Sequence, residues 1–244
     1  MCGRFTLRAP AGAVAEQFSL LQVPPLEPRY NIAPSQPVAV VRSSPQRQLA
    51  FLRWGLVPPW ADDPAIGNRL INARAEGIAE KPAFRAAFRQ RRCLVVADGF
   101  YEWRRSGRQR QPYFFHMRDD RPLGFAGLWE SWEGPDHRAI ESCTILTTAA
   151  NELVRPVHDR MPVIVAPADY ARWLGEEKGD SPHLPERPEG CFAQMGTVPF
   201  FRPESLLDLL RPYASEAMAA SAVSPWVNSP AHDDPRCVEP AVEQ

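Results

Sequence analysis

The spacing of apolar and polar residues predicts two amphipathic helices in the first half of the chain. Residues 11–20 are rich in helix-forming side chains and have apolar positions three or four residues apart. Residues 81–92 carry a proline in the first turn and two phenylalanines four residues apart, and we expect arginines on the opposite face. We expect Val14, Phe18 and Leu21 to form the apolar face of the first helix.

Runs of apolar and β-branched residues predict a sheet. Residues 37–42 and 48–56, separated by Ser-Ser-Pro, have the pattern of a hairpin, and the Trp-Gly-Leu-Val-Pro-Pro-Trp sequence at residues 54–60 favours an ordered loop. The connections between successive runs are too short for repeated crossover helices, so we expect a largely antiparallel or mixed sheet that curls toward a barrel. The further strand-like runs are residues 93–97, 112–117, 123–128, 143–148 and 163–165.

Two more helices are expected, at residues 168–174 and 204–210, between turns rich in proline. The 27 prolines are spread over the whole length and mark no single linker, and no internal repeat is present. A chain of 244 residues with 44% apolar residues can fill one large core. We therefore predict one α+β domain over residues 1–244, and a monomer.

The composition indicates in which cellular compartment the protein works. No window of about 18 apolar residues occurs, and the N-terminus lacks a basic segment followed by an apolar one, so neither a membrane span nor a signal peptide is predicted. We expect a cytoplasmic protein associated with the nucleoid. The five cysteines are widely spaced without a C-x-x-C pair, which argues against a disulfide framework and a structural zinc site. No metal and no cofactor are expected.

Charge is unevenly distributed although the net charge is only −1. All but two of the 28 lysines and arginines are arginine, the side chain suited to bidentate phosphate contacts. Residues 84–110 hold eight arginines against two acidic residues, whereas the last 20 residues are acidic. A phosphate-binding surface and a solvated basic face explain this pattern equally well.

The first residues, Met1-Cys2-Gly3-Arg4-Phe5, carry the most specific chemistry. Removal of Met1 would leave Cys2 with a free α-amine beside its thiol. Such a 1,2-aminothiol captures an aldehyde, because the amine forms a Schiff base and the thiol closes a five-membered ring. Cys2 could instead be the nucleophile of an amide hydrolase, or a small buried residue near the start of a strand.

Three further polar residues lie in short motifs. Asn72 follows an apolar pair and could hold a reacting group, or simply cap a turn. Glu102 lies between aromatic residues, where desolvation would raise its pKa and make it a general acid or base; the alternative is a surface pair with Arg104 or Arg105. His158 suits proton transfer near neutral pH, but a lone histidine is more often structural.

A fourth motif is Arg29-Tyr30-Asn31-Ile32-Ala33-Pro34. Its polar and aromatic groups could press against a nucleobase, although a turn is the plainer interpretation. We include Asn31 and Pro34 among the candidate DNA-binding residues.

Six ordered motifs resemble the SOS response-associated peptidase (SRAP) family. They are Met-Cys-Gly-Arg-Phe, Tyr-Asn-Ile-Ala-Pro, Trp-Gly-Leu-Val-Pro-Pro-Trp, Asn-Ala-Arg-Ala-Glu, Gly-Phe-Tyr-Glu-Trp and His-Asp-Arg-Met-Pro. The likeness runs from Cys2 to the tail, where the Val-Ser-Pro-Trp-Val-Asn sequence at residues 223–228 also fits. Residues 104–110 and 176–189 look variable, and nothing is carried over to them.

The resemblance implies a sensor of abasic sites in single-stranded DNA. Its Cys2 would become the N-terminus and form a thiazolidine crosslink with the ring-opened sugar, surrounded by Asn72, Glu102 and His158. Side chains implied to bind the DNA backbone are Arg4, Arg74 and Arg160. Parts of the DNA-binding surface would be Pro34, Trp54 and Trp103.

Two other functions stay open from the sequence. Some glutamine amidotransferases also begin Met-Cys-Gly, and Cys2 with His158 could form a thiol peptidase pair. A non-catalytic module that binds single-stranded DNA is the other alternative. It would bind DNA without forming a crosslink.

Overall fold

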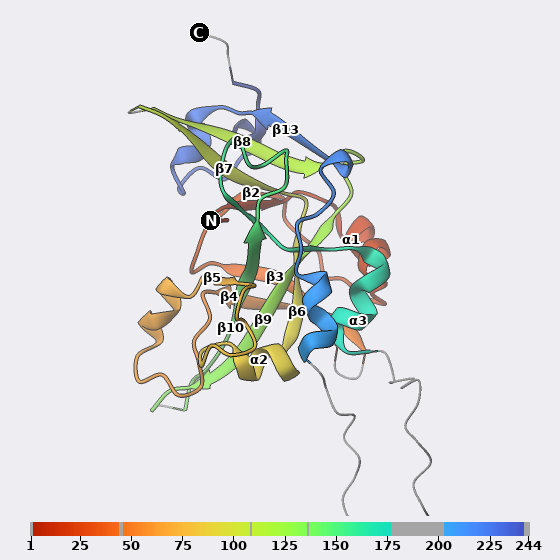
Figure 1. The fold of residues 1–244 in the computed structure, drawn as a ribbon, viewed down its shortest axis with the longest axis vertical. Helices are drawn as coiled ribbons and strands as arrows, with labels where there is room; N and C mark the ends of the chain where they lie inside the picture. The colour runs from red at the N-terminus through yellow and green to blue at the C-terminus, as the bar shows by residue number, and fades with distance from the viewer. Residues whose placement is uncertain (1, 44–45, 108, 136, 177–202, 242–244) are drawn as a thin grey trace, which may run out of the picture.

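Two β-sheets with short helices packed around them form the body of the molecule (Figure 1). The computed structural model describes residues 2–43, 46–107, 109–135, 137–176 and 203–241. These ranges leave out Met1 and Cys191. They also leave out the variable stretch at residues 176–189, except for Glu176.

The first sheet is antiparallel and has the order β13-β8-β7-β1-β2. It occupies the upper part of Figure 1, where β7 and β8 form a long hairpin. Sequence patterns predicted part of β8 but missed the other strands, because β1 and β2 are very short and β7 mixes aromatic and charged residues. The strands are β1 (Phe5–Leu7), β2 (Arg29–Ile32), β7 (Gly99–Ser106), β8 (Gln109–Met117) and β13 (Met218–Ala222).

The second sheet closes on itself. Pairing runs β10-β4-β3-β6-β9, and β9 pairs with β10 again, so these five strands form a ring. β10 runs parallel to β4 and β5, whereas the other pairs are antiparallel, which confirms the predicted mixed, barrel-like sheet. The strands are β3 (Pro37–Ser43), β4 (Arg47–Trp54), β5 (Asn72–Arg74), β6 (Arg92–Ala97), β9 (Leu123–Glu133), β10 (Ala139–Ala149), β11 (Arg160–Pro162) and β12 (Ile164–Val165).

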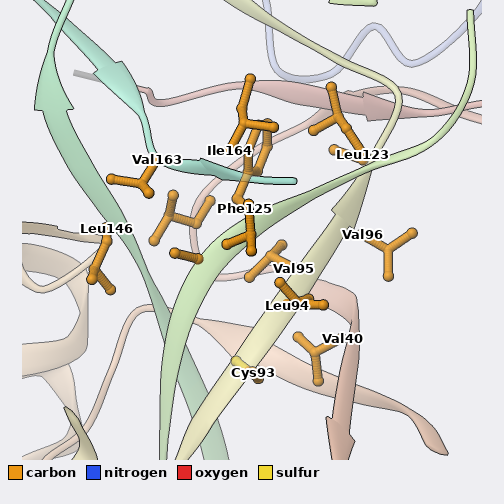
Figure 2. Packing of buried hydrophobic residues seen from close by; sticks show 14 of the residues in the cluster. Val40, Cys93, Leu94, Val95, Val96, Leu123, Phe125, Leu146, Val163 and Ile164 are labelled. Atoms are coloured by element: carbon orange, nitrogen blue, oxygen red, sulfur yellow. The ribbon is translucent and has the colours of Figure 1, made fainter. Parts of the chain in front are cut away.

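The main core lies where the ring strands face one another (Figure 2). Val95 is paired with Val40 on one side and with Phe125 on the other, and all three side chains are fully buried. Because β6 is buried along most of its length, its sequence is a continuous apolar run rather than an alternating one.

The α-helices are shorter than the sequence pattern predicted. α1 (Ala11–Phe18) ends because Ser19 adopts a left-handed conformation, with φ of 53°. This turn carries Leu20 into the core and leaves Leu21 86% exposed, so the prediction that Leu21 lies on the buried face was wrong.

α2 (Arg85–Gln90) begins four residues later than predicted, and residues 82–84 form a turn. Its two phenylalanines, Phe84 and Phe88, are nevertheless buried as expected. α3 (Tyr170–Leu174) follows a 3-10 turn, and the helix expected at residues 204–210 is a 3-10 helix.

Five of the six 3-10 helices in the described residues begin with a proline, because a proline at the first helical position loses no hydrogen bond. No helix among the described residues is long and apolar enough to cross a membrane. The turns are η1 (Pro64–Arg69), η2 (Pro167–Asp169), η3 (Pro203–Leu209), η4 (Ser215–Ala217), η5 (Pro225–Asn228) and η6 (Pro235–Val238).

Candidate active site

The N-terminal segment is fixed inside the protein by β1, which lies between β2 and β7. Phe5 pairs with Ile32 on one side and with Phe100 on the other. Its ring is fully buried and meets Trp54 edge-on at a centroid distance of 5.1 Å. Because this anchor is only three residues from Cys2, Cys2 is also fully buried.

A buried carboxylate fixes the other end of this segment. Asp98 accepts hydrogen bonds from the Thr6 hydroxyl and from the backbone N–H groups of Arg8 and Ala9, the last at 2.8 Å. The Nε atom of Arg8 lies 3.2 Å from the same carboxylate. With these four contacts, Asp98 holds the chain as it leaves β1.

Asn72 contacts Cys2 directly. Its Nδ2 donates a 2.8 Å hydrogen bond to the Cys2 carbonyl oxygen. The contact is possible because β5 pairs in parallel with β10, placing Asn72 beside Ile145 in a strand rather than in the turn considered from sequence. The Asn72 Oδ1 atom is buried and accepts no hydrogen bond from the described residues.

Glu102 is buried in β7 with 3% of its surface exposed. Burial raises the pKa of its carboxyl above the usual value, and the positive field of His158 partly opposes this shift. The alternative of a surface pair with Arg104 or Arg105 is therefore wrong. Burial, and next the negative field of Glu102, also raise the pKa of the Cys2 thiol.

His158 lies in the loop just before β11. The backbone N–H of Arg160 donates to its Nδ1 at 3.0 Å, so in the neutral ring Nδ1 is the acceptor and Nε2 carries the proton. Asp159 Oδ1 also lies 3.0 Å from Nδ1 and would pair with a protonated ring. His158 is thus oriented by its own loop in both charge states.

Glu102 and His158 line one hollow of about 520 Å³. Trp103 and three arginines of the β7–β8 hairpin, Arg104, Arg105 and Arg110, also line it. The structure thus brings together all four residues proposed for chemistry. Asn72 forms a hydrogen bond with Cys2. The charge of Glu102 shifts the pKa of the Cys2 thiol, and the charge of His158 shifts the pKa of Glu102. Among the described residues, no group of three or more His, Cys, Asp or Glu side chains could hold a metal ion.

The buried Glu102 should weaken the fold at neutral pH. Because the pKa of Glu102 is raised in the folded state, folding favours the protonated carboxyl. The free energy of unfolding is therefore greatest below the unfolded-state pKa of about 4.3, and it falls as pH rises through the folded-state pKa. Glu102→Gln should therefore raise Tm at pH 7, by about 2–4 °C for each 1 kcal/mol. Thermal unfolding at pH 7 and pH 4 tests this. An equal gain at both pH values would contradict it.

The arginines implied to bind DNA differ in accessibility. Arg74 is exposed. Arg4 is half-buried; burial lowers its pKa, and it donates to Asn31 Oδ1 at 2.7 Å and to the Val227 carbonyl at 3.0 Å. Arg160 is 13% exposed and is paired with a carboxylate, Glu76, at 2.6 Å.

Two of the residues expected at the DNA surface are internal. Trp54 is fully buried and donates from Nε1 to the Ile71 carbonyl at 2.8 Å, so it packs the core instead of stacking on a base. Asn31 is also fully buried, with its side chain bound to Arg4 and to backbone carbonyls. Neither side chain is therefore available at the surface of the protein. Trp60, at the end of the same loop motif, is the exposed tryptophan, at 59%.

Trp103 and Pro34 are half-buried. The Trp103 indole donates to Asn228 Oδ1 at 2.7 Å, and the Arg4 guanidinium lies 5.9 Å from its ring centroid. Arg4 and Trp103, both predicted to bind DNA, therefore lie together at the N-terminal segment.

Sequence reasoning missed the contribution of residues 225–238, which we call the C-terminal clasp. Carbonyls of Val227 and Asn228 accept from Arg4, and Asp233 accepts from the backbone N–H groups of Tyr30 and Asn31 at 2.5 and 2.8 Å. The Val-Ser-Pro-Trp-Val-Asn motif was the available signal, but nothing in it indicated a contact with the other end of the chain.

The site therefore combines a buried cysteine at position 2 with an amide, a carboxyl and an imidazole, contributed by elements of both sheets and by the loop before β11. The family model described as "SOS response associated peptidase (SRAP)" matches residues 1–194. The chain belongs to this family, as its motifs indicated.

Relatives and solved structures agree with this assignment. The chain is 38% identical to "Abasic site processing protein YoqW" of Bacillus subtilis, over 98% of this chain and 99% of that protein. It is 32% identical to "Abasic site processing protein HMCES" of Gallus gallus, over 87% and 66%. A crystal structure of a Bacteroides thetaiotaomicron protein has the same fold, with a TM-score of 0.77 and 24% identity over 99% of this chain and all of that one.

Proposed function

We propose that this protein captures abasic sites in single-stranded DNA through a covalent bond to Cys2. The observation that carries the proposal is the Asn72 side chain, which holds the Cys2 carbonyl and keeps a buried, unused acceptor beside it. An α-amine on Cys2, freed by removal of Met1, would supply the donor that this acceptor lacks. The names of the relatives support the choice of an abasic site as the target.

The reaction begins with the sugar of the abasic nucleotide, which is mostly a closed hemiacetal. Glu102, kept protonated to higher pH by burial, donates a proton to the ring oxygen while His158 accepts the proton of the anomeric hydroxyl, so the ring opens and exposes the aldehyde. The Cys2 amine, held by Asn72, adds to the aldehyde carbon to give a carbinolamine. An α-amine has a pKa near 8, so a useful fraction is neutral and nucleophilic at pH 7.

His158 then returns this proton to the hydroxyl of the carbinolamine, which leaves as water and gives an iminium ion. The Cys2 sulfur then bonds to the iminium carbon, and the thiol proton passes to the Glu102 carboxylate. One water molecule leaves overall, and the product is a thiazolidine. The buried thiol has a raised pKa and stays protonated until this step, which favours ring closure over a role as a free thiolate.

The same thiol chemistry argues against a peptidase as the main activity. A thiol peptidase needs a thiolate, which is stabilised by a positive neighbour such as a protonated histidine. Here burial is the main cause that raises the pKa of the Cys2 thiol, and the field of Glu102, when ionised, raises it further.

Denaturing electrophoresis after incubation with an abasic single-stranded oligonucleotide tests the proposal. We expect a protein–DNA band that survives heat and detergent, and no band with an undamaged or a reduced abasic oligonucleotide, which lacks the aldehyde. Absence of the band in protein whose Met1 is shown by mass spectrometry to be removed would rule out covalent capture. DNA binding without a band would favour the non-catalytic module.

Glu76 should compete with DNA for Arg160. Its carboxylate pairs with both terminal nitrogens of the guanidinium, at 2.6 and 2.9 Å, in the position that a phosphate would take. Exposed pairs of this kind contribute up to about 1 kcal/mol, so Glu76→Gln should tighten binding of undamaged single-stranded DNA by up to about fivefold. Fluorescence anisotropy at low salt measures this. Weaker binding by the variant would show instead that the pair positions Arg160 for DNA.

A further inference from the structure

The arginine-rich stretch at residues 84–110 divides into two groups in the fold. One group lies on and after α2, at the bottom of Figure 1, and the other lies on the β7–β8 hairpin at the top. Near α2, Arg91 pairs with Glu130 at 2.8 Å, and Arg92 donates to the carbonyls of Phe88 and Trp173. These two arginines are therefore bound to partners within the fold.

The hairpin places two arginines directly opposite each other. Arg105 of β7 is the register partner of Arg110 of β8, and both side chains are exposed. Like charges at directly opposite positions of an antiparallel pair are destabilising. Among the described residues, no carboxylate forms an ion pair with either arginine, so nothing in this part of the chain relieves the repulsion.

A third arginine of the hairpin is held in place by an aromatic ring. The Arg104 guanidinium lies 5.0 Å from the centroid of Tyr113, which stands on the neighbouring strand. This cation–π contact leaves the guanidinium N–H groups available at its edge. A stacked arginine loses less conformational entropy when it then binds a phosphate.

All three arginines line the hollow that contains Glu102 and His158. The acidic side chains in the same lining are Glu102, which is buried, and Asp159, which pairs with His158. The wall formed by the hairpin is therefore positive and faces the place where the sugar aldehyde would react.

We propose that Arg104, Arg105 and Arg110 bind a backbone phosphate of the DNA strand immediately beside the captured abasic nucleotide. A phosphate between Arg105 and Arg110 would replace their repulsion with two charge-assisted contacts. The proposal rests on the proposed function, because the hollow is taken to hold the abasic sugar. It adds a contact that sets how the strand leaves the reaction centre.

The test uses the triple variant Arg104→Ala/Arg105→Ala/Arg110→Ala and a matched control, Arg85→Ala/Arg89→Ala, which removes exposed arginines from α2. The affinity for an abasic oligonucleotide and the rate of crosslinking are both measured as a function of salt concentration. Loss of one phosphate contact lowers the slope of log affinity against log salt by about 0.7 for single-stranded DNA. We expect such a loss in the triple variant and no change in the control.

A second arm locates the phosphate. Abasic oligonucleotides carrying one neutral methylphosphonate at successive positions should slow the wild-type protein most when the neutral group adjoins the lesion. The triple variant should not respond to that substitution. A double variant, Arg105→Lys/Arg110→Lys, keeps the charge and should retain most of the salt slope.

The outcomes separate the two proposals. If the wild-type protein forms no crosslink, the proposed function is wrong. If it forms one, but the triple variant matches it in salt slope and in its response to the methylphosphonates, the hairpin does not contact the strand. A triple variant with a lowered Tm is replaced by the lysine variant and the methylphosphonate series, which test the same contact in folded protein.

Discussion

Replacing Cys2 with alanine should abolish the heat-stable crosslink to an abasic oligonucleotide while leaving DNA binding within about twofold of wild type. The alanine variant keeps the α-amine and can still form a Schiff base, which borohydride should trap. Without the thiol, the ring cannot close, so the unreduced adduct should disappear on heating. Electrophoresis with and without borohydride measures both species.

Two controls show whether the amine and the thiol of one residue are both needed. Cys93→Ala removes another fully buried thiol from the core and should leave the yield of crosslink unchanged. One residue inserted between Met1 and Cys2 keeps the thiol but ties its amine in a peptide bond, and should give no stable crosslink. A durable crosslink from either Cys2→Ala or the insertion would refute thiazolidine formation.

Replacing Glu102 with glutamine should slow crosslink formation and its reversal by about 10²- to 10⁴-fold each, the usual contribution of general acid–base catalysis. Glutamine keeps the shape of the side chain but cannot carry a proton. In the wild-type protein, the rate should fall as pH rises through the raised pKa of Glu102, because the acid form is lost. This falling limb should be missing from the pH profile of the variant.

Glu130→Gln is the matched control, because Glu130 is equally buried, at 3% exposure, but pairs with Arg91 near α2. Its rates and pH profile should follow wild type. Reversal is measured by transfer of the oligonucleotide to a competing aminothiol. Unchanged rates in both directions for Glu102→Gln would remove the proton-transfer role.

Local patterns predicted the elements whose sequence has a clear period. The β3–β4 hairpin, the buried phenylalanines of α2 and the central strands β6 and β9 were found because apolar side chains repeat along them. Strands β1 and β5 are three residues long, too short to show a period, yet they carry the segment after Cys2 and the side chain of Asn72. They exist because neighbouring strands supply their hydrogen bonds.

The candidate site was predicted from ordered motifs rather than from geometry. Those motifs name Glu102 and His158, but only the fold shows that one is buried and that both line the same hollow. The motifs also failed to separate Trp54 from Trp60, since burial depends on how the loop returns to the sheet. The closure of the ring through β9 and β10 is likewise a long-range pairing that no local window contains.

The C-terminal clasp has a consequence for how the protein is made. Arg4 leaves the ribosome 223 residues before Val227, the residue whose carbonyl it binds. Until the clasp has been synthesised, the N-terminal segment lacks these partners and remains accessible to an aminopeptidase. In the folded chain Cys2 is fully buried. We therefore expect Met1 to be removed during translation, and a chain that folds before this processing should keep the amine of Cys2 blocked.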